Sequence, residues 1–100
     1  GVDAKKTGSP EVSVYPQPAR EFVVFKLNNV NSQKKKIRSS PSISIFDFTG
    51  KEIVSGQKIG YDNRFVWSFI DKNGNSFGSG VYFYEINSGD NTIKGKFIKK

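Results

Sequence analysis

The 100-residue chain contains no cysteine, no histidine and no methionine. The absence of cysteine excludes disulfides, thiolate metal sites and cysteine nucleophiles. It does not identify a redox compartment, because an exported domain with an adequate core needs no disulfide. The absence of histidine removes the imidazole base, and with it both the Ser-His-Asp triad and histidine-metal sites. We therefore expect a protein that is not an enzyme and holds no cofactor.

Long apolar runs are also missing. No run approaches the ~20 residues of a membrane-spanning helix, and no signal peptide is visible. The chain begins at Gly1 rather than Met, so we expect a processed or excised piece of a longer protein. Its first ten residues, GVDAKKTGSP, are small, polar and without pattern. They predict a flexible linker or tail over residues 1–10, followed by a single domain over residues 11–100.

The formal net charge is +7, and the positions of the basic residues decide how this charge is interpreted. A nucleic-acid-binding protein collects basic residues on one face and places exposed aromatic rings among them. Here the aromatic residues lie within alternating strand patterns, so we expect no nucleic-acid partner. The basic residues instead fall in the tail, in a polar connection and at the end of the chain, as Lys5, Lys6, Lys34, Lys35, Lys36, Arg38, Lys94, Lys96, Lys99 and Lys100.

Fourteen aromatic residues favour strands, because aromatic and β-branched side chains fit the pleated surface of a sheet. No segment shows a sustained helical period. Turn-forming residues recur about every ten positions, which is typical of an antiparallel sandwich. We predict an all-β, seven-stranded, antiparallel immunoglobulin-like β-sandwich. Its expected strands are a short one before Pro16 and then residues 21–27, 42–48, 52–54, 64–69, 80–86 and 92–98.

Two connections have features of their own. Residues 28–40 form an unusually long polar connection that we expect to be mobile. In the segment 42–48, Ile43 and Ile45 alternate and then Phe46 and Phe48 take the opposite phase, which indicates a bulge or a twist. Asp47 precedes a tight turn and is interpreted as the acceptor of that turn.

The stretch DKNGNS, residues 71–76, resembles the start of a calcium loop. A calcium loop of the EF-hand type needs glycine at its sixth position and glutamate at its twelfth. Counted from Asp71, those positions hold Ser76 and Tyr82. A tight turn is the favoured interpretation, because Asn-Gly tolerates positive φ.

Trp67, Tyr82 and Tyr84 could form an exposed sugar-binding platform, as in carbohydrate-binding modules. All three lie on alternating strand faces that a sandwich of this size needs as core, so burial is the favoured interpretation. Tyr82 follows a glycine at the start of a strand. Its hydroxyl is expected to bond a nearby backbone group, as in a tyrosine corner.

An ordered series of motifs resembles a known family. The series is VYPQPA (14–19), SIFDFTGKEI (44–53), WSFIDKNGN (67–75), SGVYFYEI (79–86) and KGKFIKK (94–100). It is similar to the C-terminal sorting domain of the type IX secretion system of Bacteroidetes, and to the immunoglobulin-like domain of the flagellar hook-capping protein. The chain has Pro16-Gln17-Pro18 where relatives usually read Pro-Asn-Pro, and Phe69 where they often have glycine. The second departure predicts local repacking.

The resemblance implies a non-catalytic secretion and sorting domain on a larger cargo protein. The implied partners are the outer-membrane type IX secretion machinery, a sortase-like peptidase and the N-terminal cargo domains of the same chain. The implied location is the periplasm in transit and then the cell surface or the medium. The family's recognition region corresponds here to Gly80, Tyr82, Lys94, Lys96, Lys99 and Lys100. The alternatives are a structural module of the hook-cap type and a carbohydrate-binding module of a secreted enzyme.

Overall fold

The computed structural model describes residues 11–28, 41–60 and 62–100. The predicted tail, most of the predicted mobile connection and the basic residues Lys5, Lys6, Lys34, Lys35, Lys36 and Arg38 lie outside these ranges. No helix long and apolar enough for a membrane crossing occurs in the described part of the chain. The described chain forms seven strands, namely β1 (Glu11–Tyr15), β2 (Val23–Asn28), β3 (Ser42–Phe46), β4 (Glu52–Lys58), β5 (Arg64–Trp67), β6 (Gly80–Ser88) and β7 (Asn91–Lys99).

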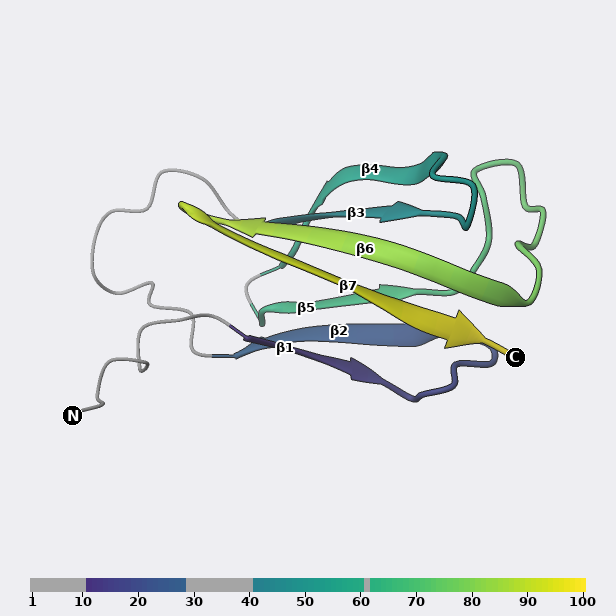
Figure 1. Cartoon of the computed structure of the whole chain (residues 1–100), viewed down its shortest axis with the longest axis horizontal. Helices are drawn as coiled ribbons and strands as arrows, with labels where there is room; N and C mark the ends of the chain where they lie inside the picture. Colours follow the sequence, from purple (N-terminus) through teal and green to yellow (C-terminus); the bar gives the residue numbers. More distant parts are fainter. Residues whose placement is uncertain (1–10, 29–40, 61) are drawn as a thin grey trace.

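The strands form two antiparallel sheets packed face to face, as predicted. One sheet has the order β1-β2-β5 and the other the order β4-β3-β6-β7. Figure 1 shows the two layers, with β7 running diagonally across the side of the sandwich. In the constant-type immunoglobulin fold the fourth strand belongs to the sheet of the first strand. Here β4 pairs with β3 instead, so the second sheet is the larger one.

The core fills the space between the sheets with aromatic rings. Phe25 of β2 lies edge-on to Tyr84 and to Phe97, with ring centroids 5.2 and 5.4 Å apart. A second group surrounds Trp67, whose ring is 4.7 Å from Phe69 and 5.7 Å from Tyr82. Each large apolar side chain removed from water contributes about 1.5–3 kcal/mol. These rings therefore account for much of the stability of a domain that has no disulfide.

Local backbone geometry explains where the strand ends differ from the sequence prediction. β3 ends at Phe46 because the Asp47 side chain starts a turn. The predicted bulge exists in the β3–β4 pairing, but its extra residues lie in β4, where Gly56 has a φ of 53°. β5 ends at Trp67, two residues before Phe69, whose φ is 60°. A phenylalanine with positive φ lies outside the extended region of the backbone, so the strand ends before it.

Phe69, where the sequence predicts local repacking, has a left-handed backbone. This is the conformation that glycine adopts most readily. The Phe69 side chain is nevertheless buried, at 2% exposure. The phenyl ring therefore fills core space at a position where the backbone favours glycine.

The segment that follows Pro18 ties the two sheets together at one side of the sandwich. The Ala19 amide donates to the carbonyl of Ile98 at 2.8 Å, and the Lys100 amide donates to the carbonyl of Ala19 at 2.7 Å. Ala19 thereby forms a parallel bridge with the end of β7. The end of β7 is consequently held by hydrogen bonds on both of its edges.

Candidate functional site

Tyr82, one of the predicted recognition residues, lies in the core near the start of β6. It is 5% exposed, and its ring stacks on Phe97 with centroids 5.6 Å apart. Its hydroxyl donates to the carbonyl of Gly78 at 2.5 Å, which confirms the predicted bond to a nearby backbone group. Burial, and secondarily the charge of Asp47, raises the pKa of the Tyr82 hydroxyl. Tyr82 therefore fixes the segment around Gly78, just before β6, and offers little surface to a partner.

Gly80 begins β6 with a φ of 144°, a conformation that side chains rarely adopt. A Cβ built on Gly80 would meet no atom within 4 Å. The position therefore requires glycine for its backbone angle and not for lack of space. Gly80 lies opposite Lys99 in the β6–β7 register, so a distortion at Gly80 would be transmitted to the end of β7.

The loop 71–75 is a hydrogen-bonded turn. The Asp71 Oδ1 atom accepts from the amides of Asn73 and Asn75 at 2.8 and 2.9 Å, and Gly74 has a φ of 88°. The hydrogen bond from the Asn75 amide is the largest cause that lowers the pKa of Asp71. Because this carboxylate oxygen accepts two amides of the loop, the turn interpretation is confirmed.

The turn between β3 and β4 has the same design. The Asp47 Oδ1 atom accepts from the Thr49 hydroxyl at 2.6 Å and from the amides of Thr49 and Lys51 at 2.9 and 3.0 Å. The bond from the Thr49 hydroxyl is the main cause that lowers the pKa of Asp47. Asp47 is the predicted turn acceptor.

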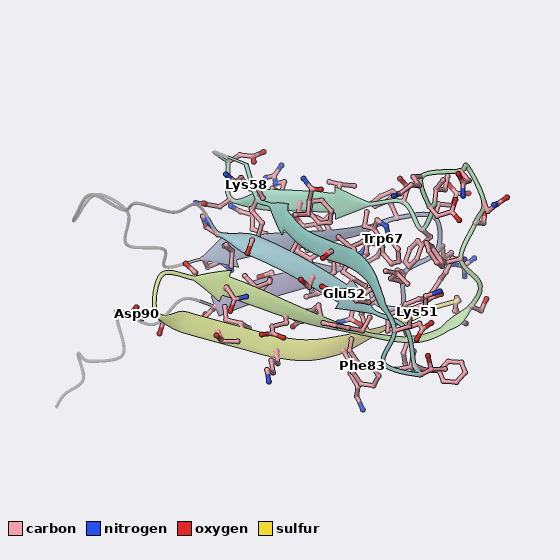
Figure 2. The ribbon with its side chains drawn as sticks, turned by 90° about the horizontal axis from the view of Figure 1, so that it is seen from above. Lys51, Glu52, Lys58, Trp67, Phe83 and Asp90 are labelled. Carbon is pink, nitrogen blue, oxygen red and sulfur yellow. The ribbon has the colours of Figure 1, made fainter. Side chains whose placement is uncertain are left out.

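The favoured interpretation of Trp67, Tyr82 and Tyr84 as core residues is confirmed, because they are 6%, 5% and 8% exposed. Burial also raises the pKa of the Tyr84 hydroxyl. Figure 2 labels Trp67 in a crowded group of side chains. None of the three can stack on a polysaccharide, so the carbohydrate-binding alternative is wrong for these residues.

The four lysines at the end of the chain do not form one patch. Side chains of a strand alternate between the two faces of a sheet. Phe97 points into the core, so Lys94 and Lys96 lie on the outer face, where both are exposed. Lys99 lies on the inner side, and its Nζ atom is 5.2 Å from the centre of the Phe69 ring, a cation–π contact. Lys100 is exposed beyond the strand and bonds Ala19 through its backbone.

The free edge of β7 is shorter than the strand itself. In an antiparallel pair, alternate residues direct both backbone groups away from the partner strand. Ala19 binds the carbonyl of Ile98 and the amide of Lys100, so the backbone groups of these two residues point away from β6. Every second residue of the strand shares this direction, which includes Lys96 and Lys94. Within the described residues, the outward groups of Lys94 and Lys96 have no backbone partner on this edge. The open edge therefore coincides with the two lysines of the outer face.

The sequence interpretation missed an apolar surface beside these lysines. Val81, Phe83 and Ile98 lie on the outer face of the four-stranded sheet and are 36%, 40% and 48% exposed. Val81 is paired with Ile98 and Phe83 with Lys96. The signal was present in GVYFYEI, where both alternating faces carry apolar residues, whereas a sandwich sheet buries only one face.

Comparison with known proteins identifies relatives of this architecture. A family model described as "Secretion system C-terminal sorting domain" matches residues 13–100. Among solved structures, PorZ of Porphyromonas gingivalis, described as an essential bacterial surface component of the type-IX secretion system, is similar with a TM-score of 0.63 and 21% sequence identity. The match covers 89% of this chain and 11% of PorZ. Dimeric latent PorU from the same organism has a TM-score of 0.54 and 24% identity, over 90% of this chain and 9% of PorU.

At these identities the likeness to the two solved structures shows a shared fold. The chain spans about a tenth of the length of either protein. No curated protein sequence matches the chain.

Proposed function

The chain belongs to the family of secretion system C-terminal sorting domains, and from this we propose that it directs a larger cargo protein through the outer membrane by the type IX secretion system. The family match over residues 13–100 carries the proposal. The same match favours sorting over the hook-cap alternative. The domain acts as a sorting signal, an address that the secretion machinery recognises in its folded form, and it catalyses no reaction of its own.

The proposed partners are the outer-membrane type IX machinery, a sortase-like peptidase that releases the domain, and cargo domains that precede it in the same chain. The proposed route runs through the periplasm to the cell surface or the medium. A folded address needs a rigid shape that a receptor can recognise. The interlocked rings around Trp67 and Phe25 supply such a scaffold.

Among the residues predicted for recognition, we assign direct contact to Lys94, Lys96 and Lys100, whose side chains are exposed. An acidic partner would be steered toward these cations. The open backbone edge between Lys94 and Lys96 allows a partner strand to add to the sheet. Gly80 and Tyr82 act indirectly, because they shape the start of β6, and Lys99 acts through its contact with Phe69.

The test is an export assay. Residues 1–100 are fused behind a periplasmic signal peptide and a fluorescent reporter and expressed in a host that has the type IX system. We expect fluorescence at the cell surface or in the medium, and loss of this export in a host that lacks the translocon. A reporter that stays in the periplasm of the competent host would contradict the proposal.

A matched pair of variants tests the role of the lysines. Lys94→Glu/Lys96→Glu reverses the charge at the proposed contact, whereas Lys51→Glu/Lys58→Glu reverses two exposed lysines at the ends of β4. Each double variant lowers the net charge by the same amount. We expect the first pair to reduce export strongly and the second to leave it close to the parent level. Equal effects of the two pairs would assign the result to net charge alone.

A further inference from the structure

The outer face of the four-stranded sheet carries an apolar stripe, defined here as Phe46, Val81, Phe83 and Ile98. The stripe crosses three neighbouring strands, because Phe46 pairs with Phe83 across β3–β6 and Val81 pairs with Ile98 across β6–β7. Figure 2 shows the Phe83 ring projecting away from the sheet, at the same end of the molecule as Lys51. Phe46 and Phe83 lie on the two inner strands of this sheet, and Ile98 lies on the edge strand β7.

A hollow adjoins the stripe. Its volume is about 510 Å³, and its lining includes the side chains of Phe46, Phe83, Glu85, Lys94 and Lys96. Phe83 lies opposite Lys96, and Glu85 lies opposite Lys94. The hollow is therefore apolar toward Phe46 and Phe83, and its charged residues are two lysines and one glutamate. Such a surface can receive an apolar side chain with a carboxylate beside it.

The exposure of these neighbouring apolar residues argues for a partner. An antiparallel sheet whose outer face meets only water has polar residues there, and a contiguous exposed apolar patch commonly marks an interaction site. Aromatic residues near the centre of an interface are frequent sources of binding energy. Phe83 has this position and is 40% exposed.

We propose that the apolar stripe and the hollow are the docking surface for a protein partner that inserts an apolar side chain beside Phe83 and places carboxylates against Lys94 and Lys96. This inference rests on the proposed function, and it names the part of the folded address that a receptor contacts. The positive charges of Lys94 and Lys96 and the net charge of +7 favour an acidic partner. The same charge disfavours a second copy of the chain as the occupant, because two copies of like charge repel.

The outer face of the other sheet provides a matched control. It also carries exposed apolar residues, since Tyr15 and Val66 both flank Val24 in the register and are 42% and 54% exposed. The proposal predicts that this second apolar area is not required for docking. The comparison therefore separates a specific contact from a general effect of surface hydrophobicity.

The experiment uses the reporter fusion with the full domain. Val81→Thr/Phe83→Ser removes the stripe at its centre, Tyr15→Ser/Val66→Thr is the control, and Phe83→Leu keeps the apolar character. We expect export by the first variant to fall by about tenfold or more, as for loss of a central aromatic contact. The control and Phe83→Leu should stay within about twofold of the parent. Thermal unfolding of each purified domain verifies that the variants fold.

The outcomes are distinguishable. Failure of the parent fusion to be exported would remove the proposed function, and with it this inference. Export of the parent together with undiminished export of a folded Val81→Thr/Phe83→Ser variant would overturn the docking surface alone. An equal loss in the Tyr15→Ser/Val66→Thr control would also overturn it. Sedimentation that shows a dimer of the parent and a monomer of Phe83→Ser would assign the surface to a second copy and overturn the acidic partner.

Discussion

The phenol ring of Tyr84 covers Gly95, its direct partner in the β6–β7 register. A Cβ built on Gly95 would lie 2.6 Å from Cζ and 2.9 Å from Cε2 of this ring. Both distances are shorter than any real contact of a Cβ atom. The ring of Tyr84 is buried at 8% exposure and also packs edge-on against Phe25, so it has no room to move aside.

We therefore predict that Gly95→Ala destabilises the domain by about 1–3 kcal/mol, as expected for overpacking. In a Tyr84→Ala background the same substitution should cost nothing, because the opposing ring is gone. Urea unfolding of the four proteins of this double-mutant cycle measures the coupling. Equal costs of Gly95→Ala in both backgrounds would contradict the contact.

The bond from the Tyr82 hydroxyl to Gly78 leads to a second prediction. Tyr82→Phe keeps the ring between Trp67 and Phe97 and removes only the donor to the Gly78 carbonyl. We expect a loss of about 0.5–1.5 kcal/mol of unfolding free energy. Tyr15→Phe, at an exposed tyrosine, should change stability by less than about 0.5 kcal/mol. Chemical denaturation compares the two variants, and a similar result for both would argue against the bond.

Phe69 combines a buried side chain with a left-handed backbone, and the two effects can be separated. Phe69→Ala loses the core ring but keeps the strained φ, whereas Phe69→Gly loses the ring and relieves the strain, which is about 1–2 kcal/mol. We expect both variants to be destabilised, with Phe69→Ala the less stable of the two. This order is opposite to the usual preference for alanine over glycine. Thermal unfolding midpoints measure the order. A higher midpoint for Phe69→Ala than for Phe69→Gly would contradict backbone strain at this residue.

The Asp71 carboxylate predicts a pH dependence. Its folded pKa is lowered, mainly by the amide of Asn75, relative to about 3.9 in an unfolded chain. The corresponding stability is present above that value and is lost as the pH falls through the lower folded pKa. Asp71→Asn keeps the Oδ1 acceptor but does not titrate.

We expect the urea midpoint of the parent to fall between pH 5 and pH 2 by more than that of Asp71→Asn. The difference will be modest because the carboxylate is exposed. Carboxyl titration by NMR gives the folded pKa directly, and a value above about 3.9 would reverse the predicted sign.

The sequence was sufficient for the number and approximate place of the strands because each strand has its own alternation and turn signals. It was insufficient where tertiary contacts or backbone angles determine where a strand begins or ends. The three-residue prediction for β4 fell short of the observed Glu52–Lys58 because the bulge at Gly56 interrupts the alternation. The strand predicted through Phe69 ended early because no local pattern reports a positive φ at a phenylalanine.

In the candidate site, too, some features follow from the sequence pattern and others depend on the folded structure. The alternation of β7 could have separated Lys99 from Lys94 and Lys96, because Phe97 identifies the core-facing positions. The contact of Lys99 with Phe69 could not be predicted, since it joins segments 30 residues apart that meet only in the folded state. The outer-face stripe was visible as apolar residues on both faces of GVYFYEI, but its hollow depends on the packing of three strands.

The bridge between Ala19 and the end of β7 has a consequence for the order of events during synthesis. Ala19 leaves the ribosome early, while the Ile98 carbonyl and the Lys100 amide that bind it are among the last groups of this domain to emerge. The β6–β7 hairpin can form locally, but the bridge must wait for both ends. Contacts between residues so distant in the chain form slowly. A receptor that recognises the closed sandwich would therefore reject a chain whose synthesis stopped before β7, so closure would report that translation of the domain is complete.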